Sequence, residues 1–310
     1  MGKHKRFFFV TIRIAVACIF LFLVVQFFDF AEISESTGKL LDQPILLLMM
    51  VIGYWSSFYL KAKAWMVYVE DDGPVKNYLD AIFYSLVINH LLPVKGGELV
   101  RVGYIHHKNK LSLSLAAEST VAMRLLDLVI LGVIAASGSF LFGISISFQL
   151  VAGLIIGCGL LLLGLVAYTR FRPFIISYLE KLSKIVLSKK GLKMVTLVFV
   201  SWLLEAIVIY LIVFASFKPI PILDAIWVNS FTIAGQVFQF TPGGIGTYES
   251  FMSIALKTVG YPLATGLTIA VVTHAVKFIF SFGCGLYVLL FAPIRLEQIV
   301  FWLKKKRGSQ

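Results

Sequence analysis

Two short polar stretches interrupt long apolar runs and carry most of the residue types that could bind a charged ligand. The first covers residues 89–101 and reads NHLLPVKGGELVR, and the second covers 241–249 and reads TPGGIGTYE. Glycines let the backbone approach a ligand closely, and a broken helix offers free N–H groups that attract anions. A glutamate follows the glycines in each stretch, Glu98 in one and Glu249 in the other. We therefore predict that the two stretches form one polar site.

Charged side chains in other apolar runs extend this candidate site. Arg124 and Asp127 are three residues apart, so they can share one helix face. The bases could neutralise a phosphate, while the carboxylates could hold a cationic headgroup, couple to protons or balance the bases. The alternative is that these groups pair only with one another and stabilise the fold. The candidate substrate-binding residues are Asn89, Pro93, Lys95, Gly96, Gly97, Glu98, Arg101, Arg124, Asp127, Pro242, Gly243, Gly244, Gly246, Glu249 and Lys277.

The composition places the elements that carry these residues in a membrane. The 310 residues are 59% hydrophobic and 14% charged, with a mean hydropathy of +0.91, whereas soluble domains are nearer half apolar and a quarter charged. Apolar runs of roughly 17–25 residues suit helices rather than barrel strands. The net charge of +12 fits cytoplasmic loops facing anionic lipid, not nucleic acid. We predict an all-α integral membrane protein with one transmembrane domain over residues 1–310.

Run lengths and flanking charges predict about six full transmembrane helices and two re-entrant segments. Loop 29–43 is acidic and is expected outside, helix 44–60 ends inside at Lys61 and Lys63, and both chain termini are expected in the cytoplasm. A basic amphipathic linker over about 170–190 is expected on the cytoplasmic leaflet. The full helices are expected at about 7–28, 44–60, 111–138, 147–168, 193–216 and 262–291, and the re-entrant segments around the breaks at 93–97 and 241–249.

These orientations predict an inverted repeat. The first repeat spans about 44–138 and its re-entrant segment opens inward, whereas the second spans about 193–291 and its segment opens outward. Glycine- and proline-interrupted apolar segments at corresponding places in two halves are typical of transporters, with the binding site near the midplane.

Three motifs in order resemble the lysylphosphatidylglycerol synthase transmembrane-region family, also called the flippase-like-domain family. They are N-x-L-L-P-x-x-x-G-E-L-x-R at Asn89–Arg101, R-L-L-D-L at Arg124–Leu128 and P-G-G-I-G-x-Y-E at Pro242–Glu249. The resemblance implies the membrane half of enzymes that make and flip aminoacylated phosphatidylglycerol. It implies here a translocating part without the synthase, because the chain ends at Gln310. Family members often have a glutamate before the arginine of the second motif, whereas this chain has Met123, so no role is carried over there.

The expected function is a lipid flippase or lipid-headgroup transporter in the inner (cytoplasmic) membrane, moving a phospholipid or a lipid-linked precursor. We expect no enzymatic activity, cofactor or metal, and we expect membrane lipids as partners. One alternative is a membrane transferase acting on a lipid donor, with histidines such as His90 and His274 as bases. However, the sequence has no D-D-x-x-D motif, nucleophile elbow or zinc-ligand spacing. Another alternative is a non-transporting partner of an envelope-synthesis enzyme.

Overall fold

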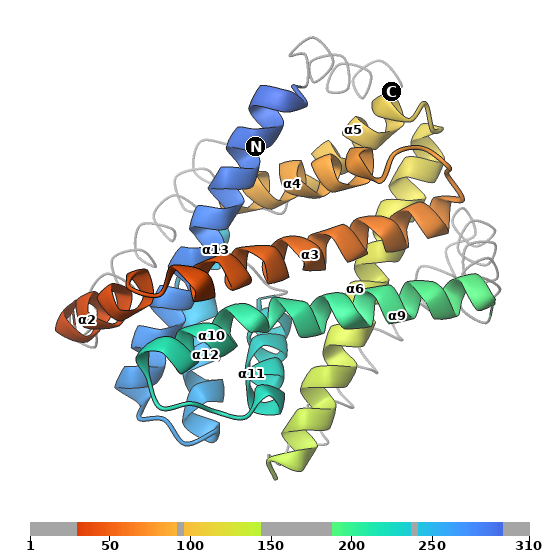
Figure 1. Ribbon diagram of the computed structural model, residues 1–310. Helices are drawn as coiled ribbons and strands as arrows, with labels where there is room; N and C mark the ends of the chain where they lie inside the picture. Colours follow the sequence, from red (N-terminus) through yellow and green to blue (C-terminus); the bar gives the residue numbers. More distant parts are fainter. Residues whose placement is uncertain (1–29, 92–95, 144–187, 237–240, 294–310) are drawn as a thin grey trace, which may run out of the picture.

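The computed structural model of the chain describes residues 30–91, 96–143, 188–236 and 241–293 (Figure 1). All regular structure within these ranges is helical, which confirms the predicted all-α class. The elements are α2 (Phe30–Leu41), α3 (Pro44–Val69), α4 (Val75–Leu91), α5 (Gly97–Lys108), α6 (Leu113–Leu141), α9 (Lys189–Glu205), α10 (Ile207–Ser216), α11 (Ile222–Gly235), the 3-10 turn η1 (Pro242–Gly244), α12 (Thr247–Thr258) and α13 (Leu263–Phe291).

Four of the described helical stretches are long and apolar enough to cross a membrane. Each has 26 to 29 residues, more than the ~20 that a bilayer requires. They correspond to four of the six predicted spans. The predicted spans at 7–28 and 147–168, and the linker up to residue 187, lie outside the described residues. The four stretches are Pro44–Val69, Leu113–Leu141, Lys189–Ser216 and Leu263–Phe291.

Two sequence-based boundaries are wrong. Residues 30–41 of the expected outer loop form helix α2, and Pro44 then begins α3 at a position where a missing N–H costs little. Helix α3 does not end near Lys61 but continues to Val69, because no proline or glycine follows Lys61 before Glu70 turns left-handed. Lys61 therefore lies inside the helix and is buried.

Each half of the chain contributes a helical hairpin that packs against helices of both halves. We call α4 with α5 the first hairpin, and α11 with α12 the second. The first packs on α6 of its own half and on α13 of the other, while the second packs on α13 and on α6. Helices α3 and α9 run side by side, and the two hairpins lie on opposite sides of this pair (Figure 1). Both hairpins therefore contact the same two helices, α6 and α13, as two repeats would. The opposite membrane orientation of the hairpins stays a prediction.

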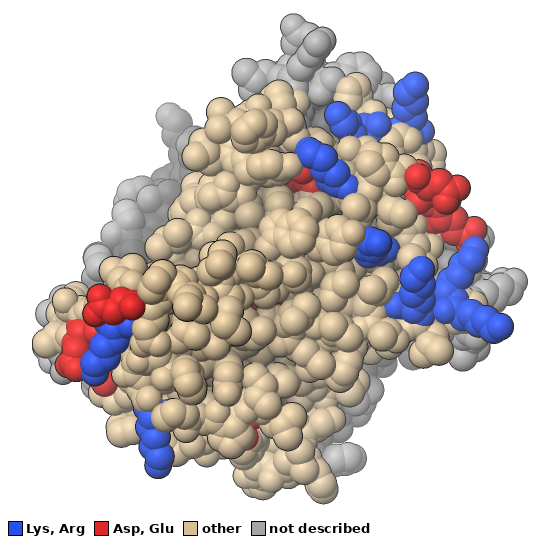
Figure 2. All heavy atoms as spheres, in the orientation of Figure 1, with Lys and Arg blue, Asp and Glu red and all other residues tan. Residues whose placement is uncertain are grey.

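The described surface is apolar between two charged ends. Large apolar side chains are exposed along the lengths of α3, α6 and α13, for example Ile45, Val129 and Ile279. Figure 2 shows charged side chains gathered near α2 at one end and where α3 ends and α9 begins at the other, with uncharged surface between. This distribution suits a protein whose middle contacts lipid.

Candidate functional site

The first predicted break is held by a side-chain cap. The Gly97 N–H, at the start of α5, donates to Asn89 Oδ1 of α4 at 2.9 Å. A Cβ on Gly97 would lie 2.3 Å from the Ser85 carbonyl oxygen, so only glycine allows α5 to pack this closely on α4. Gly96 precedes α5 as its N-cap residue. Pro93 and Lys95, between the two helices, lie outside the described residues.

The second predicted break depends on three left-handed glycines. Gly243, Gly244 and Gly246 have φ of 64°, 79° and 88°, a region that other residues rarely adopt. Pro242 begins η1, and the Gly246 N–H at the start of α12 donates to Glu249 Oε2 at 2.6 Å. Because η1 packs against α4, the second break lies beside the helix that enters the first.

A buried ionic network joins five helices between the hairpins. Lys277 Nζ of α13 lies 3.1 Å from Glu205 Oε1 of α9 and 2.9 Å from Asn229 Oδ1 of α11. Lys61 Nζ of α3 lies 3.3 Å from the other Glu205 oxygen and 3.9 Å from Asp127 Oδ1 of α6. All five side chains are buried, and Lys61 Nζ also lies 3.5 Å from the centroid of the Trp202 ring. We call these five residues the ionic network.

A histidine and a glutamate form a second buried contact beside this network. His274 Nδ1 of α13 lies 2.6 Å from Glu249 Oε1 of α12, and both side chains are buried. The Tyr248 ring stacks on the His274 imidazole with centroids 4.1 Å apart, and Phe278 lies on the same imidazole at 4.7 Å. Glu249 therefore has one oxygen on the α12 cap and the other on His274.

At the end of the network nearest the first hairpin, several buried polar atoms lack hydrogen bonds within the described residues. The Arg101 guanidinium lies over the Trp65 ring at 4.1 Å, and its nearest Glu98 oxygen is 3.7 Å away. Arg101 Nε, Glu98 Oε2 and Asp127 Oδ1 are buried, yet none has a hydrogen-bond partner in the described part of the chain. The charges of Glu98, Asp127 and Arg124 all act on Arg101. We call these four residues the open end.

Arg124 is the second guanidinium of the open end. It is half-buried on α6 and forms no ion pair with any carboxylate of the described residues. Asp127, which can share a helix face with Arg124, instead faces Lys61 of α3. Arg124 thus acts on Arg101 as a like charge, and neither guanidinium forms a salt bridge shorter than 3.7 Å with a carboxylate of the described residues.

The structure separates the predicted site residues into two groups. Glu98, Arg101, Arg124 and Asp127 make the open end, with Asn89, Gly96 and Gly97 shaping the break beside it. Glu249 and Lys277 lie at the other end, with the glycines of the second break. Sequence reasoning left Lys61, Glu205, Asn229 and His274 off the site. An acid at membrane depth was the available signal for Glu205, since buried charge in a span is expensive.

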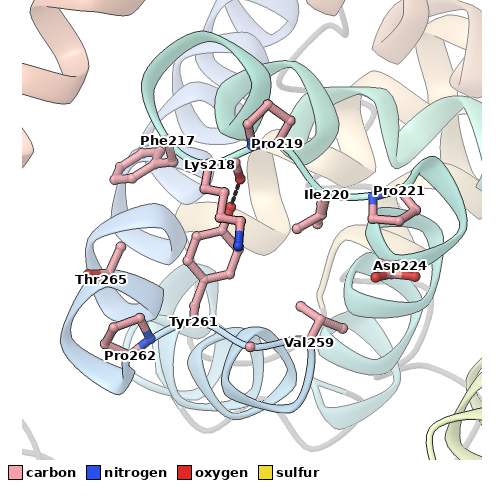
Figure 3. A pocket seen from close by; sticks show the side chains of 11 residues that line it. Phe217, Lys218, Pro219, Ile220, Pro221, Asp224, Val259, Tyr261, Pro262 and Thr265 are labelled. Carbon is pink, nitrogen blue, oxygen red and sulfur yellow. Dashed lines mark hydrogen bonds between the residues drawn. The ribbon is translucent and has the colours of Figure 1, made fainter.

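One cavity of the described structure lies beside Arg124, and another lies away from the open end. A mostly apolar groove of about 470 Å³ runs between α6 and α9, with Tyr68 of α3 also lining it. Ala122 and Leu125 of its lining lie on either side of Arg124 in sequence. A second cavity of about 470 Å³ lies where the α10–α11 and α12–α13 connections meet (Figure 3). There Tyr261 donates to the Lys218 carbonyl, and burial raises the pKa of that hydroxyl to about 12. This second cavity shares no residue with the open end.

Residues 10–285 match the family described as the lysylphosphatidylglycerol synthase TM region. The match covers most of the 310 residues, so the chain belongs to this family, as the three motifs indicated. It is therefore a membrane protein of a lipid-related family. No curated protein and no solved structure matches the chain.

Proposed function

We propose that this protein moves the headgroup of a phospholipid or lipid-linked precursor across the cytoplasmic membrane. The observation that carries the proposal is the open end. Buried charged groups are costly unless they are paired and hydrogen-bonded, yet Arg101 Nε and Asp127 Oδ1 are buried without a hydrogen bond. A ligand that completes these bonds would remove that cost.

A phosphate is the group that the open end suits best. Arg101 and Arg124 act on one another as like charges, and guanidinium pairs bind phosphate oxygens bidentately. Glu98 and Asp127 beside them also allow the headgroup to carry an amine. The proposed substrate class is therefore an anionic or zwitterionic lipid with a phosphate next to its glycerol or prenyl chain.

The apolar groove between α6 and α9 gives the lipid tails a place beside the headgroup. Its lining residues Ala122 and Leu125 flank Arg124 along α6. A headgroup needs a polar, enclosed path across the bilayer, whereas its tails can stay in an apolar environment. The two hairpins on either side of the network fit movement in which one half of the protein rocks against the other.

Reconstitution in vesicles tests this proposal. Proteoliposomes carrying tail-labelled fluorescent phosphatidylglycerol or phosphatidylethanolamine would be quenched from outside with dithionite. The wild-type chain should move label between leaflets faster than protein-free vesicles do. R101Q and R124Q should each lower the rate at least tenfold, because each removes one phosphate ligand, while K193Q, an exposed lysine on α9, should leave it unchanged.

Two results would reject the proposal. One is a wild-type rate equal to that of protein-free vesicles. The other is full activity in R101Q and R124Q when both variants are folded. The mass of the recovered lipid separates the transferase alternative, because a transporter returns the probe with its mass unchanged, whereas a transferase changes it.

A further inference from the structure

The His274–Glu249 pair contacts the backbone of the second break and is not part of the proposed headgroup site. One Glu249 oxygen contacts His274 Nδ1 at 2.6 Å, and the other accepts the Gly246 N–H at 2.6 Å. Gly246 is the N-cap residue of α12, and its φ of 88° follows two other left-handed glycines. The carboxylate is thus shared between a titratable imidazole and the backbone of a helix break.

An imidazole buried against a carboxylate is a chemical proton site. An ionised carboxylate only accepts hydrogen bonds, so Nδ1 carries the hydrogen of the neutral ring and donates it to Glu249. The pair then bears one negative charge. Binding one more proton, on the imidazole or on the carboxylate, brings the net charge of the pair to zero. Histidine is the side chain whose ordinary titration falls between about pH 5 and 8.

We propose that the His274–Glu249 pair reversibly binds a proton, and that this proton drives movement of the headgroup. The inference rests on the proposed function and adds the coupling ion. The proton enters from the aqueous phase on one side and leaves to the other. The bound proton neutralises the negative charge of the pair, so the Glu249 oxygen accepts more weakly from the Gly246 N–H and the start of α12 is released.

The pair is also linked to the headgroup site through charge. Lys277 lies one turn from His274 on α13 and binds Glu205, which in turn binds Lys61 beside Asp127. A change of one charge at the pair alters the potential at Lys277, and the shared Glu205 carries the effect toward the open end. The proton and the headgroup phosphate therefore act on opposite ends of one ionic network.

Titratable and charged groups near the pair come from several of the helices around α12 and α13. They include a lysine, a histidine, two tyrosines and two further carboxylates. The titratable and charged groups around α12 and α13 are Tyr248 on α12, Lys277 on α13, His90 on α4, Glu205 on α9, Tyr54 on α3 and, further along α13, Glu32 on α2, which accepts from Thr268.

The test uses the full chain in proteoliposomes with tail-labelled fluorescent phosphatidylglycerol as the probe. A pH difference of about two units across the vesicle should change the wild-type translocation rate at least threefold relative to equal pH. H274Q and E249Q should lose this response. The matched control is H106Q, since His106 is a histidine of α5 that contacts the Leu111 carbonyl, and the variant should leave the response intact.

A second measurement detects the proton without any transport. Infrared spectra of the purified protein, titrated between about pH 5 and 8, should show a carboxyl signal that disappears in E249Q and shifts in H274Q. E249Q keeps an oxygen that can accept from the Gly246 N–H, and Y248F keeps the ring stack, so loss of signal in E249Q alone reports the carboxyl.

The outcomes separate this inference from the proposed function. Lipid movement that ignores the pH difference in the wild-type chain would overturn the coupling and leave transport standing. A titrating Glu249 signal without lipid movement would reject transport and keep the proton site. A wild-type spectrum with no pH-dependent signal that E249Q or H274Q removes would overturn the proton site itself.

Discussion

At the scale of single residues, Glu205 is the group on which the buried charges depend. It is the one acid that contacts two lysines in the described network, with Lys61 on one oxygen and Lys277 on the other. Two cations and one shared carboxylate leave a positive excess, which Asp127 offsets at 3.9 Å from Lys61. Each buried lysine is thus paired with a carboxylate from another helix. This pairing offsets the cost of burying charges from different helices.

This arrangement predicts an order of stabilities among variants. E205Q leaves two buried lysines without their carboxylate, and removing one partner of a buried pair costs about 3–5 kcal/mol. K277M removes a cation but leaves Glu205 bound to Lys61, so it should cost less. Thermal unfolding in detergent micelles should give E205Q the lower midpoint. A lower midpoint for K277M than for E205Q would contradict this account of Glu205.

A second residue-scale prediction concerns the turn between α3 and α4. Burial alone would raise the pKa of Asp71, but hydrogen bonds from Tyr78, Asn109 and the Gly73 N–H hold it below its ordinary value. A lowered folded-state pKa adds stability above the ordinary carboxyl pKa of about 4, and this stability is lost as pH falls through the lowered value. The apparent unfolding midpoint of the wild-type chain should fall over that window.

The matched variant for this turn is D71N, which cannot titrate. Its midpoint should be lower than that of the wild-type chain at neutral pH and should fall less steeply below about pH 4. Equal slopes for the two proteins over the acid range would show that Asp71 does not contribute to acid sensitivity.

Residue types alone indicated part of the candidate site. The motifs contain Glu98, Arg101, Asp127 and Glu249, and Lys277 stands out as a charge in an apolar run. They did not indicate Lys61, because it directly follows an apolar run and precedes Lys63, which is the pattern of a helix end. Only the structure shows that α3 continues to Val69 and buries Lys61 beside Glu205. A partner on a distant helix leaves no trace in local sequence.

At the scale of elements, the close approach of α5 to α4 is the feature that the first break secures. A Cβ on Gly97 would lie 2.3 Å from the Ser85 carbonyl oxygen and 2.7 Å from Asn89 Oδ1. Neither atom can move freely, since one is backbone and the other caps α5. The hairpin therefore has no room for any other residue at position 97.

This predicts that G97A is strongly impaired. The added methyl should push α5 off α4 and cost about 1–3 kcal/mol, the usual cost of overpacking. The control is G132A on α6, where an added Cβ meets no atom within 4 Å. Thermal unfolding in micelles should show a lower midpoint for G97A and an unchanged or slightly higher one for G132A. Equal midpoints would show that the hairpin can open without cost.

The positions of the long helices could be predicted from the sequence better than the contacts between helices. Apolar run lengths placed α6 and α13 within a few residues, and the paired glycine breaks marked the hairpins. The outer stretch 30–41 was expected to be a loop because its acids and serines are polar, yet it forms α2, whose buried residues include Leu40. Whether a polar stretch folds into a helix depends on such tertiary contacts, and a single sequence does not show them.

At the scale of the whole molecule, the charges predict which ends face which compartment. Lys193 near the start of α9 and Lys218 before α11 are both exposed and lie at opposite ends of the span Lys189–Ser216. If the basic end is cytoplasmic, a cysteine at 193 should react with a membrane-impermeant maleimide only after cells are opened, and a cysteine at 218 in intact cells. Both substitutions would be made in a cysteine-free chain. Labelling of both positions from outside would contradict the orientation.

Native mass spectrometry of the purified protein measures directly whether Arg101 and Arg124 hold a lipid phosphate. The wild-type chain should retain a phospholipid, and the R101Q/R124Q double variant should lose it while remaining folded. The surface variant K193Q/K218Q removes the same amount of charge and should keep the lipid. Equal lipid occupancy in the wild-type chain and the R101Q/R124Q variant would contradict the proposed site.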